Sequence, residues 1–317
     1  MSQRIPVGAV LTETFNFARV RWLTVFTYFW LPILLIGAFV FGASQVIFDP
    51  AAINAAGDDV TLAHLAAAMR VPASVAVLFG LAGVLLMMAL YAGAFASVFR
   101  LVALGEERPG IFQLRFDGPA QRVFWGQLIL AVMNYGLFFL IGVVVMLASG
   151  ESFQTMGDGL GRLTIMIIGS ALEGSTLTQE QLQPIAGPLG VVGNTIMISF
   201  LVLAYLNLKL VPFLPGSAVE NRLLFLGAFR MTRGHFWTIL GVYVIFIAAM
   251  LVLTIVYELT TGVIDLMSGL AGGGALSLIG GLFGIIGVAV TVAYQVYIMG
   301  AQLALCAIIY RRITTGE

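Results

Sequence analysis

The chain has 317 residues, of which 60% are hydrophobic and 9% are charged, with 15 acidic and 15 basic side chains. Soluble domains are about 25% charged, and even large ones leave much of their surface in water. The mean hydropathy of +1.04 therefore excludes an ordinary water-soluble protein. The composition indicates an all-α polytopic integral membrane protein. The single cysteine, Cys306, lies in an apolar run and excludes an intrachain disulfide.

Six apolar segments along the chain are long enough to cross a bilayer. A helix needs about 20 apolar residues to cross a hydrocarbon core of about 30 Å. The second and sixth segments are longer than this, so we expect them to tilt, kink or protrude. The first is too long for the apolar region of a cleaved signal peptide, which favours an uncleaved span. The predicted transmembrane helices are Leu23–Ala43, Ser74–Ala103, Phe124–Leu147, Leu189–Leu214, Phe236–Leu259 and Leu276–Tyr310.

An arginine followed three residues later by an aromatic residue precedes the first, third and fifth spans. Each of these spans leads into a loop, a second span and a basic residue, which predicts a hairpin unit that occurs three times. We expect a single membrane domain over residues 1–317, built from three pseudo-repeated hairpins at 6–108, 109–216 and 217–317. The motifs are Arg19-x-x-Trp22, Arg122-x-x-Trp125 and Arg233-x-x-Phe236 followed by Trp237, and the closing basic residues are Arg100, Lys209 and Arg311.

The charges are divided between the two sides of the predicted bundle. The side that holds both termini carries 13 of the 15 basic residues, and only Arg70 and Arg162 fall on the other side. Nine of the 15 acidic residues fall opposite the termini. Basic residues in short loops stay in the cytoplasm. The pattern predicts a multi-pass protein of the bacterial cytoplasmic (inner) membrane with both termini in the cytoplasm.

Two connecting segments on the cytoplasmic side are typical of interfacial helices. Pro6–Arg21 places apolar residues on one face at helical spacing, and Glu220–Thr232 is similar. In the middle copy Gly118-Pro119 interrupts any earlier helix, so we expect one to start near Pro119. On the far side Leu160–Ala171 is apolar but too short to span, which predicts an interfacial or re-entrant segment.

The repeated arginines and aromatics are the candidate lipid-headgroup and interfacial residues. Amphipathic rings settle at headgroup depth, and a basic residue near an anionic leaflet gains about 1 kcal/mol. One interpretation treats the arginines as topology signals that contact headgroup phosphates. The other has them converge on one anionic lipid or partner. The residues are Arg19, Trp22, Arg122, Trp125, Arg233 and Trp237.

The side chains that catalysis usually needs are few. His64 and His235 fall on opposite sides of the predicted bundle, so they cannot share a metal, and no cluster has metal-ligand spacing. Cys306 lacks a nearby base in the sequence, which favours a packing role over a nucleophile. Gly280, Gly284 and Gly287 are spaced for close helix packing rather than for a phosphate loop. We therefore expect no enzyme activity, no cofactor and no metal.

Neutral amides are the polar groups that the sequence places at membrane depth. No Asp, Glu, Lys or Arg is central in a predicted span, which disfavours an ion-coupled transporter. Hydrogen bonds between helices explain such amides better than a substrate path does. The intramembrane polar packing candidates are Gln127, Asn134, Asn194, Asn207 and Gln295.

One segment resembles a known family. Leu214-Pro215 through Glu220, then Ala228-Phe229-Arg230-Met231-Thr232-Arg233-Gly234 and Trp237, is similar to a segment of prokaryotic multi-span proteins in the glycerophosphodiester phosphodiesterase membrane domain family. Members tend to carry Ser-Trp where this chain has Ala228-Phe229. Active members carry catalysis on a separate soluble barrel domain. The resemblance therefore implies a membrane domain without that barrel.

These observations favour a non-catalytic membrane protein that binds lipid or acts as an accessory or scaffold subunit of a membrane complex. The expected partners are membrane lipids and another membrane protein complex, and no nucleic acid. The alternative is a transporter of small molecules or lipids, since internal repeats are common in transporters.

Overall fold

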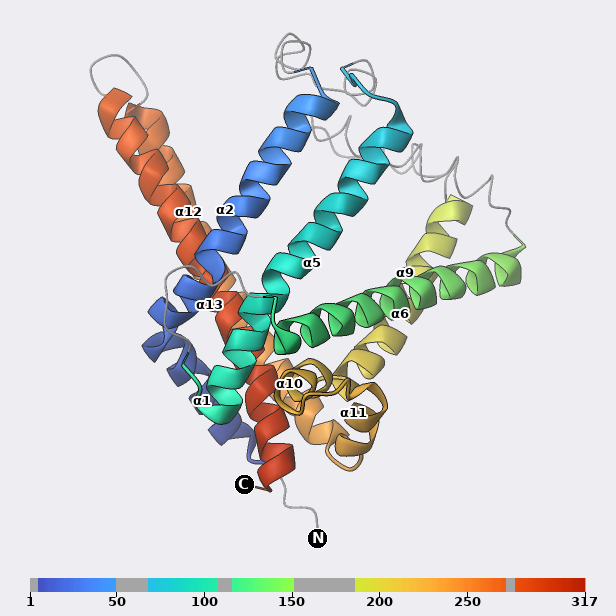
Figure 1. Cartoon of the computed structure of the whole chain (residues 1–317). Helices are drawn as coiled ribbons and strands as arrows, with labels where there is room; N and C mark the ends of the chain where they lie inside the picture. Colours follow the sequence, from blue (N-terminus) through green and yellow to red (C-terminus); the bar gives the residue numbers. More distant parts are fainter. Residues whose placement is uncertain (1–4, 50–67, 108–115, 151–185, 272–276, 317) are drawn as a thin grey trace. The chain divides into compact units, whose positions relative to one another are not determined.

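The computed structural model describes residues 5–49, 68–107, 116–150, 186–271 and 277–316. Within these ranges the chain is helical, and the β structure there is one isolated antiparallel bridge between Phe48 and Met69. The predicted all-α class is therefore confirmed for this part of the chain (Figure 1). The predictions for His64, Arg162 and Leu160–Ala171 lie outside the described residues.

Six helices in the described ranges are long and apolar enough to cross a membrane, in agreement with the six spans predicted there. All six predicted segments correspond to these helices, and several helices continue past the predicted ends, whereas α9 ends at Lys209, five residues before the predicted Leu214. The fifth ends twelve residues later than predicted, because a helix can extend beyond the hydrocarbon core into the headgroup region. The helices are α2 (Trp22–Ile47), α5 (Ala73–Leu104), α6 (Gly118–Ser149), α9 (Ala186–Lys209), α12 (Phe236–Ala271) and α13 (Ser277–Thr315).

The chain folds as two compact units. Unit 1 contains Met1–Ile33, Met88–Gln127 and Asn207–Glu317, and unit 2 contains Leu34–Met87 and Leu128–Leu206. Helices α2, α5, α6 and α9 each contribute residues to both units, whereas α12 and α13 belong to unit 1 alone. The predicted repeat boundaries remain a prediction.

Unit 1 has a tightly packed core at the end where α1 (Val7–Val20) begins and α13 ends (Figure 1). Helices α5 and α13 have 32 and 39 residues, about 48 and 58 Å at 1.5 Å per residue. Both helices enter this core shortly before they end, where Phe99, Leu305 and Ile308 are each at most 1% exposed. Part of the length that exceeds a bilayer core of about 30 Å is thus packed against other helices of the protein.

Helix α1 confirms the helix predicted before the first span. Its apolar face, with Val10, Leu11 and Ala18, is buried, and the helix packs on α12 and α13. The Thr14 hydroxyl on the same face donates to the Val10 carbonyl at 2.8 Å, so this polar group is buried with a partner. A location in the membrane interface remains a prediction for this helix.

The segment Glu220–Thr232 is helical over only its second half, as α11 (Phe225–Met231). It follows α10 (Phe213–Val219) after a turn in which Asn221 has a φ of 57°. Asparagine tolerates this left-handed conformation better than most residues. The Ser217 hydroxyl accepts a hydrogen bond from the Leu224 backbone N–H at 3.1 Å, and this bond closes the turn and prevents a continuous helix.

Candidate functional site

The outer faces of the long helices are apolar and exposed on this chain. On α12 a row of aliphatic side chains is 59–67% exposed, and it consists of Leu251, Val252, Ile255, Leu259 and Val263. A soluble monomer rarely exposes large contiguous apolar surfaces. We therefore expect lipid or another protein to cover these faces. The candidate binding sites are the grooves in them.

Helices α12 and α13 are joined by side-chain hydroxyl groups along their shared face. Thr254 and Tyr294 are hydrogen-bonded at 2.7 Å, and Tyr257 and Thr291 at 3.0 Å. The rings of Tyr257 and Tyr294 stack with centroids 4.0 Å apart and planes within 7°. Each hydroxyl thus has a partner inside the helix pair, and the outer surface of these rings is apolar.

A groove of about 430 Å³ lies over this pair of tyrosines. We call it the α12–α13 groove. The side chains around it are aromatic or aliphatic apart from the Thr260 hydroxyl, and Trp22 of α2 is 42% exposed. The lining includes Trp22, Val256, Tyr257, Ala293, Tyr294 and Tyr297.

Arg19 lies close in sequence to one residue of this groove. It is exposed at the last turn of α1, three residues before the groove residue Trp22. Its Nη2 donates to the Asn16 side-chain oxygen at 3.3 Å. Within the described ranges no carboxylate forms an ion pair with Arg19. The groove therefore combines an apolar channel with a guanidinium that keeps donors for an anion.

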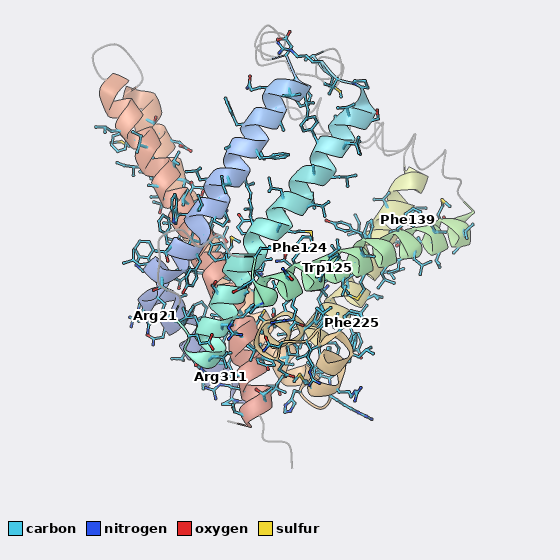
Figure 2. All side chains as sticks on the ribbon, in the orientation of Figure 1. Arg21, Phe124, Trp125, Phe139, Phe225 and Arg311 are labelled. Atoms are coloured by element: carbon cyan, nitrogen blue, oxygen red, sulfur yellow. The ribbon has the colours of Figure 1, made fainter. Side chains whose placement is uncertain are left out.

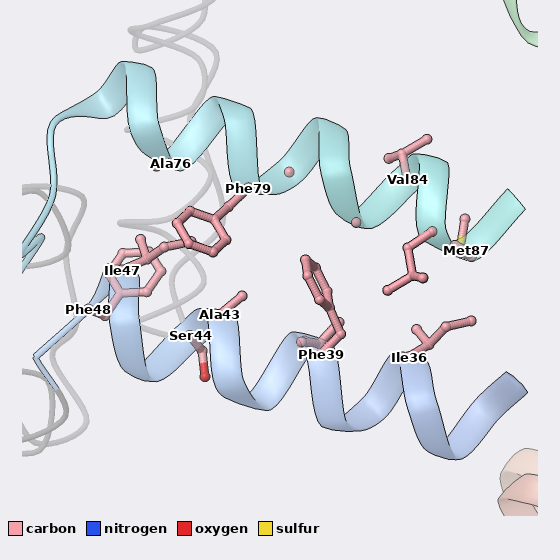
Figure 3. A pocket seen from close by; sticks show the side chains of 14 residues that line it. Ile36, Phe39, Ala43, Ser44, Ile47, Phe48, Ala76, Phe79, Val84 and Met87 are labelled. Carbon is pink, nitrogen blue, oxygen red and sulfur yellow. The ribbon is translucent and has the colours of Figure 1, made fainter. Parts of the chain in front are cut away.

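A second groove, of about 410 Å³, separates α2 from α5 within unit 2. We call it the α2–α5 groove. Phe39 points from α2 towards α5, and Phe79 and Met87 line the same space from α5 (Figure 3). The lining is apolar except for Ser44, whose hydroxyl donates to the Phe41 carbonyl at 2.7 Å. This groove offers van der Waals contact and no unused side-chain donor.

Charged side chains at the terminal end of unit 1 hold the helices together. Glu13 of α1 pairs with both Arg311 and Arg312 of α13, and Arg311 also donates to the Val102 carbonyl at 3.2 Å. Arg100 donates to both oxygens of Glu106 at 2.8 and 2.9 Å and to a backbone carbonyl of α10. Arg100 and Arg311, predicted to close their hairpins, therefore act as structural links.

The three repeated arginines have different surroundings. Arg19 and Arg233 are exposed, whereas Arg122 is half-buried and donates to the Ser217 carbonyl at 3.1 Å and to the Asn221 side chain. Among the described residues no hydrogen bond or ion pair joins the three guanidinium groups to one partner. The common site that one interpretation expects therefore remains a prediction.

The tryptophans of the second and third motifs lie in the N-terminal parts of α6 and α12, with exposed rings. Trp125 is 53% exposed and Trp237 is 78% exposed, and each forms an edge-to-face pair with the preceding phenylalanine at 5.5 and 5.3 Å. Figure 2 shows Phe124 and Trp125 at the start of α6. Exposed indole rings at these positions fit residues that meet the headgroup region.

The amide candidates are divided among several environments. Asn194 and Gln295 are exposed, and the buried Gln127 Oε1 has no partner among the described atoms. Asn134 and Asn207 are engaged with other groups. Sequence reasoning missed the hydroxyl pairs between α12 and α13. The three-residue spacing of Thr254 and Tyr257, and of Thr291 and Tyr294, is the signal that could have found them, because it places each pair on one helical face.

The remaining candidates do not gather into a catalytic or metal site in the described part of the chain. No group of three His, Cys, Asp or Glu side chains there could hold a metal ion. Cys306 lies 3.2 Å from the Tyr243 hydroxyl as a further polar pair between α12 and α13. His235 is half-buried at the start of α12. No family model matches the chain, and neither a curated protein nor a solved structure matches it.

Proposed function

We propose that this protein is a non-catalytic multi-pass protein of the bacterial inner membrane that binds an anionic lipid in the α12–α13 groove. The observation that carries the proposal is that Arg19, an exposed guanidinium without a carboxylate partner in the described residues, lies three residues before Trp22, which lines an apolar groove. The arginine binds the phosphate, and an acyl chain lies over Tyr257 and Tyr294.

The chemistry of the groove suits a lipid at both ends. A guanidinium presents five N–H donors in a fixed fork and binds phosphate through charge-assisted hydrogen bonds. Trp22 lies where an indole ring meets the headgroup region. Further along, the tyrosine hydroxyls are already satisfied by Thr254 and Thr291, so the surface accepts hydrocarbon at no cost in unpaired polar groups.

The orientation that we propose places Arg19 at the anionic leaflet. The 13-to-2 distribution of basic residues favours cytoplasmic termini, and the cytoplasmic leaflet carries the anionic lipids. A Thr315→Cys variant tests this orientation. We expect a membrane-impermeant thiol reagent to label Thr315→Cys in inverted membranes and not in intact cells, and labelling in intact cells would contradict it.

The proposal includes the three pseudo-repeated hairpins and the relation to a known family. Contacts between predicted repeats support it: Arg311 of the third donates to the Val102 carbonyl in the first, and Thr232 of the third to the Lys209 carbonyl of the second. We propose that the three hairpins pack against one another through these contacts.

We also propose that the chain is related to the glycerophosphodiester phosphodiesterase membrane domain family and lacks the catalytic barrel that active members carry.

Lipid retention by purified variants tests the proposed function. In Arg19→Gln we expect the amount of copurified anionic lipid to fall about fivefold, the ratio that corresponds to about 1 kcal/mol for one basic residue near the surface. Arg19→Lys should retain an intermediate amount, because lysine keeps the charge and loses the bidentate fork. Arg230→Gln is the matched control, since Arg230 is also exposed and lies outside the three motifs.

Filling the groove tests the acyl-chain half of the proposal. Ala293 is exposed in the groove lining, whereas Ala289 is exposed on the same helix outside it. We expect Ala293→Phe to lower lipid retention and Ala289→Phe to leave it unchanged. Equal retention in all these variants would contradict the proposal. Transfer of labelled lipid between the leaflets of reconstituted vesicles would instead favour a lipid transporter.

A further inference from the structure

The α2–α5 groove ends at an ion pair. Backbone hydrogen bonds of 2.8 Å join Asp49 N–H to the Ala68 carbonyl and Arg70 N–H to the Ile47 carbonyl. Ile47 and Phe48 line the end of the groove, so these bonds hold both charged residues directly beyond it. Arg70 Nη2 donates to Asp49 Oδ1 at 2.8 Å, and the two side chains are 52% and 38% exposed.

The length of the groove matches one leaflet rather than a whole membrane. On α2 the lining runs from Ile36 to Phe48, which is about 18 Å at 1.5 Å per residue. Half of a hydrocarbon core of about 30 Å is about 15 Å. A transmembrane helix from another protein would need a surface of twice this length. An acyl chain that starts at the charged end needs only this depth.

Glycines leave part of the groove unfilled by the chain itself. A Cβ built on Gly83 would lie 2.8 Å from the Phe39 ring, whereas a Cβ on Gly80 would meet nothing within 4 Å. The Phe39 ring therefore lies close to the backbone at Gly83, and Figure 3 shows it projecting from α2 towards α5. The space at Gly80 stays open to a thin, flexible occupant, and an acyl chain has that shape.

We propose that the α2–α5 groove is a second lipid site, selective for a zwitterionic phospholipid, with Arg70 binding the phosphate and Asp49 binding the ammonium group. The guanidinium has five donors and the carboxylate about four lone-pair sites, so both can bind a headgroup while keeping their mutual bond. The pair carries no net charge, and its carboxylate repels a headgroup that carries only negative charge. Selectivity therefore differs from that at Arg19.

By the predicted topology this site lies in the leaflet opposite to the termini. It shares no residue with the α12–α13 groove, so each proposal can fail without the other. Neutral phospholipids with an ethanolamine headgroup carry the phosphate and the ammonium group that Arg70 and Asp49 would recognise. The test uses the full-length protein in nanodiscs that contain equal amounts of phosphatidylethanolamine and phosphatidylglycerol.

The headgroup test measures the ratio of the two lipids that remain bound after detergent extraction, by mass spectrometry. We expect wild type to be enriched in phosphatidylethanolamine. Asp49→Asn should shift the ratio about fivefold towards phosphatidylglycerol, because one negative charge at the membrane surface is removed. The exchanged pair, Asp49→Arg with Arg70→Asp, should restore the wild-type preference. An unchanged ratio in Asp49→Asn would overturn the proposal.

A second experiment tests the acyl chain by filling the α2–α5 groove with a larger side chain. Gly80→Leu should lower the amount of bound phosphatidylethanolamine, and Gly136→Leu is the control, since its Cβ also meets nothing within 4 Å. Circular dichroism and the unfolding midpoint of each variant check that it is folded. Retention in Gly80→Leu equal to that in Gly136→Leu would overturn the acyl-chain assignment. A copurified protein chain that crosslinks to the Gly80→Cys variant at this position would also overturn the acyl-chain assignment.

Discussion

The pair α12–α13 and the pair α2–α5 are both apolar helix pairs, but different forces act within them. Tyr257 and Tyr294 stack between α12 and α13, and each donates or accepts a hydrogen bond across the pair. Helices α2 and α5 meet through the ring of Phe29, which packs against Tyr91 and Phe95, and farther along the same helices an apolar groove takes the place of such contacts. Lipid tails are as apolar as leucine, so apolar contact alone does not favour a neighbouring helix over lipid. Polar bonds and ring stacking therefore decide which helices adhere, and the groove is where lipid remains the better neighbour.

The ion pairs near the ends of these helix pairs also differ, in how much of their side chains is exposed. Glu13 with Arg311 and Arg312 has side chains that are 17–31% exposed, and it clamps α13 to α1. Asp49 with Arg70 has side chains that are 38–52% exposed. Loss of the Glu13 ion pairs should therefore lower the stability of the fold. Loss of the ion pair between Asp49 and Arg70 should instead change which lipid binds.

The largest effect is expected from removing a ring in the adhering pair. Tyr294→Ala deletes both the stack on Tyr257 and the bond to Thr254, and we expect it to lower the free energy of unfolding by about 3 kcal/mol. Phe79→Ala in the α2–α5 groove should cost about half of that or less, because lipid can fill the space. Unfolding midpoints in a denaturing detergent series compare the two. Equal losses would remove the distinction between the pairs.

A smaller effect is expected from loss of the partly buried ion pairs of Glu13. Glu13→Gln leaves two partly buried guanidinium groups without an anion, and we expect a loss of about 2 kcal/mol, below the range for fully buried pairs. Asp49→Asn should cost about 0.5 kcal/mol or less, as exposed pairs do. The same unfolding assay measures both. A loss in Asp49→Asn as large as that in Glu13→Gln would contradict this ranking.

The smallest effect is expected from removing a single hydrogen bond between α12 and α13. Tyr257→Phe keeps the ring stack on Tyr294 and removes the bond to Thr291, and we expect a loss of about 0.6 kcal/mol, the average for polar contacts in membrane helices. Tyr135→Phe is the control, since Tyr135 is 76% exposed. If the two variants unfold at the same midpoint, the hydroxyl pair does not contribute to adhesion.

The spans could be predicted from sequence because apolar length is a local property. The helix before the first span followed from the periodicity of Val10, Leu11 and Ala18, whose face is buried. The turn at Asn221 could not be predicted, because it depends on a bond from Leu224 to Ser217. The grooves and the Glu13 clamp could not be predicted either, since they join residues far apart in the chain whose approach depends on packing.

Lipid binding in the α12–α13 groove is tested most directly by an experimental structure of the full chain in nanodiscs that contain anionic phospholipid. We expect tubular density over Tyr257 and Tyr294 in this groove, ending in a phosphate within hydrogen-bond distance of the Arg19 guanidinium. A helix of another protein in that groove, or an Arg19 side chain paired with a carboxylate of the chain and no lipid beside it, would contradict lipid binding at this site.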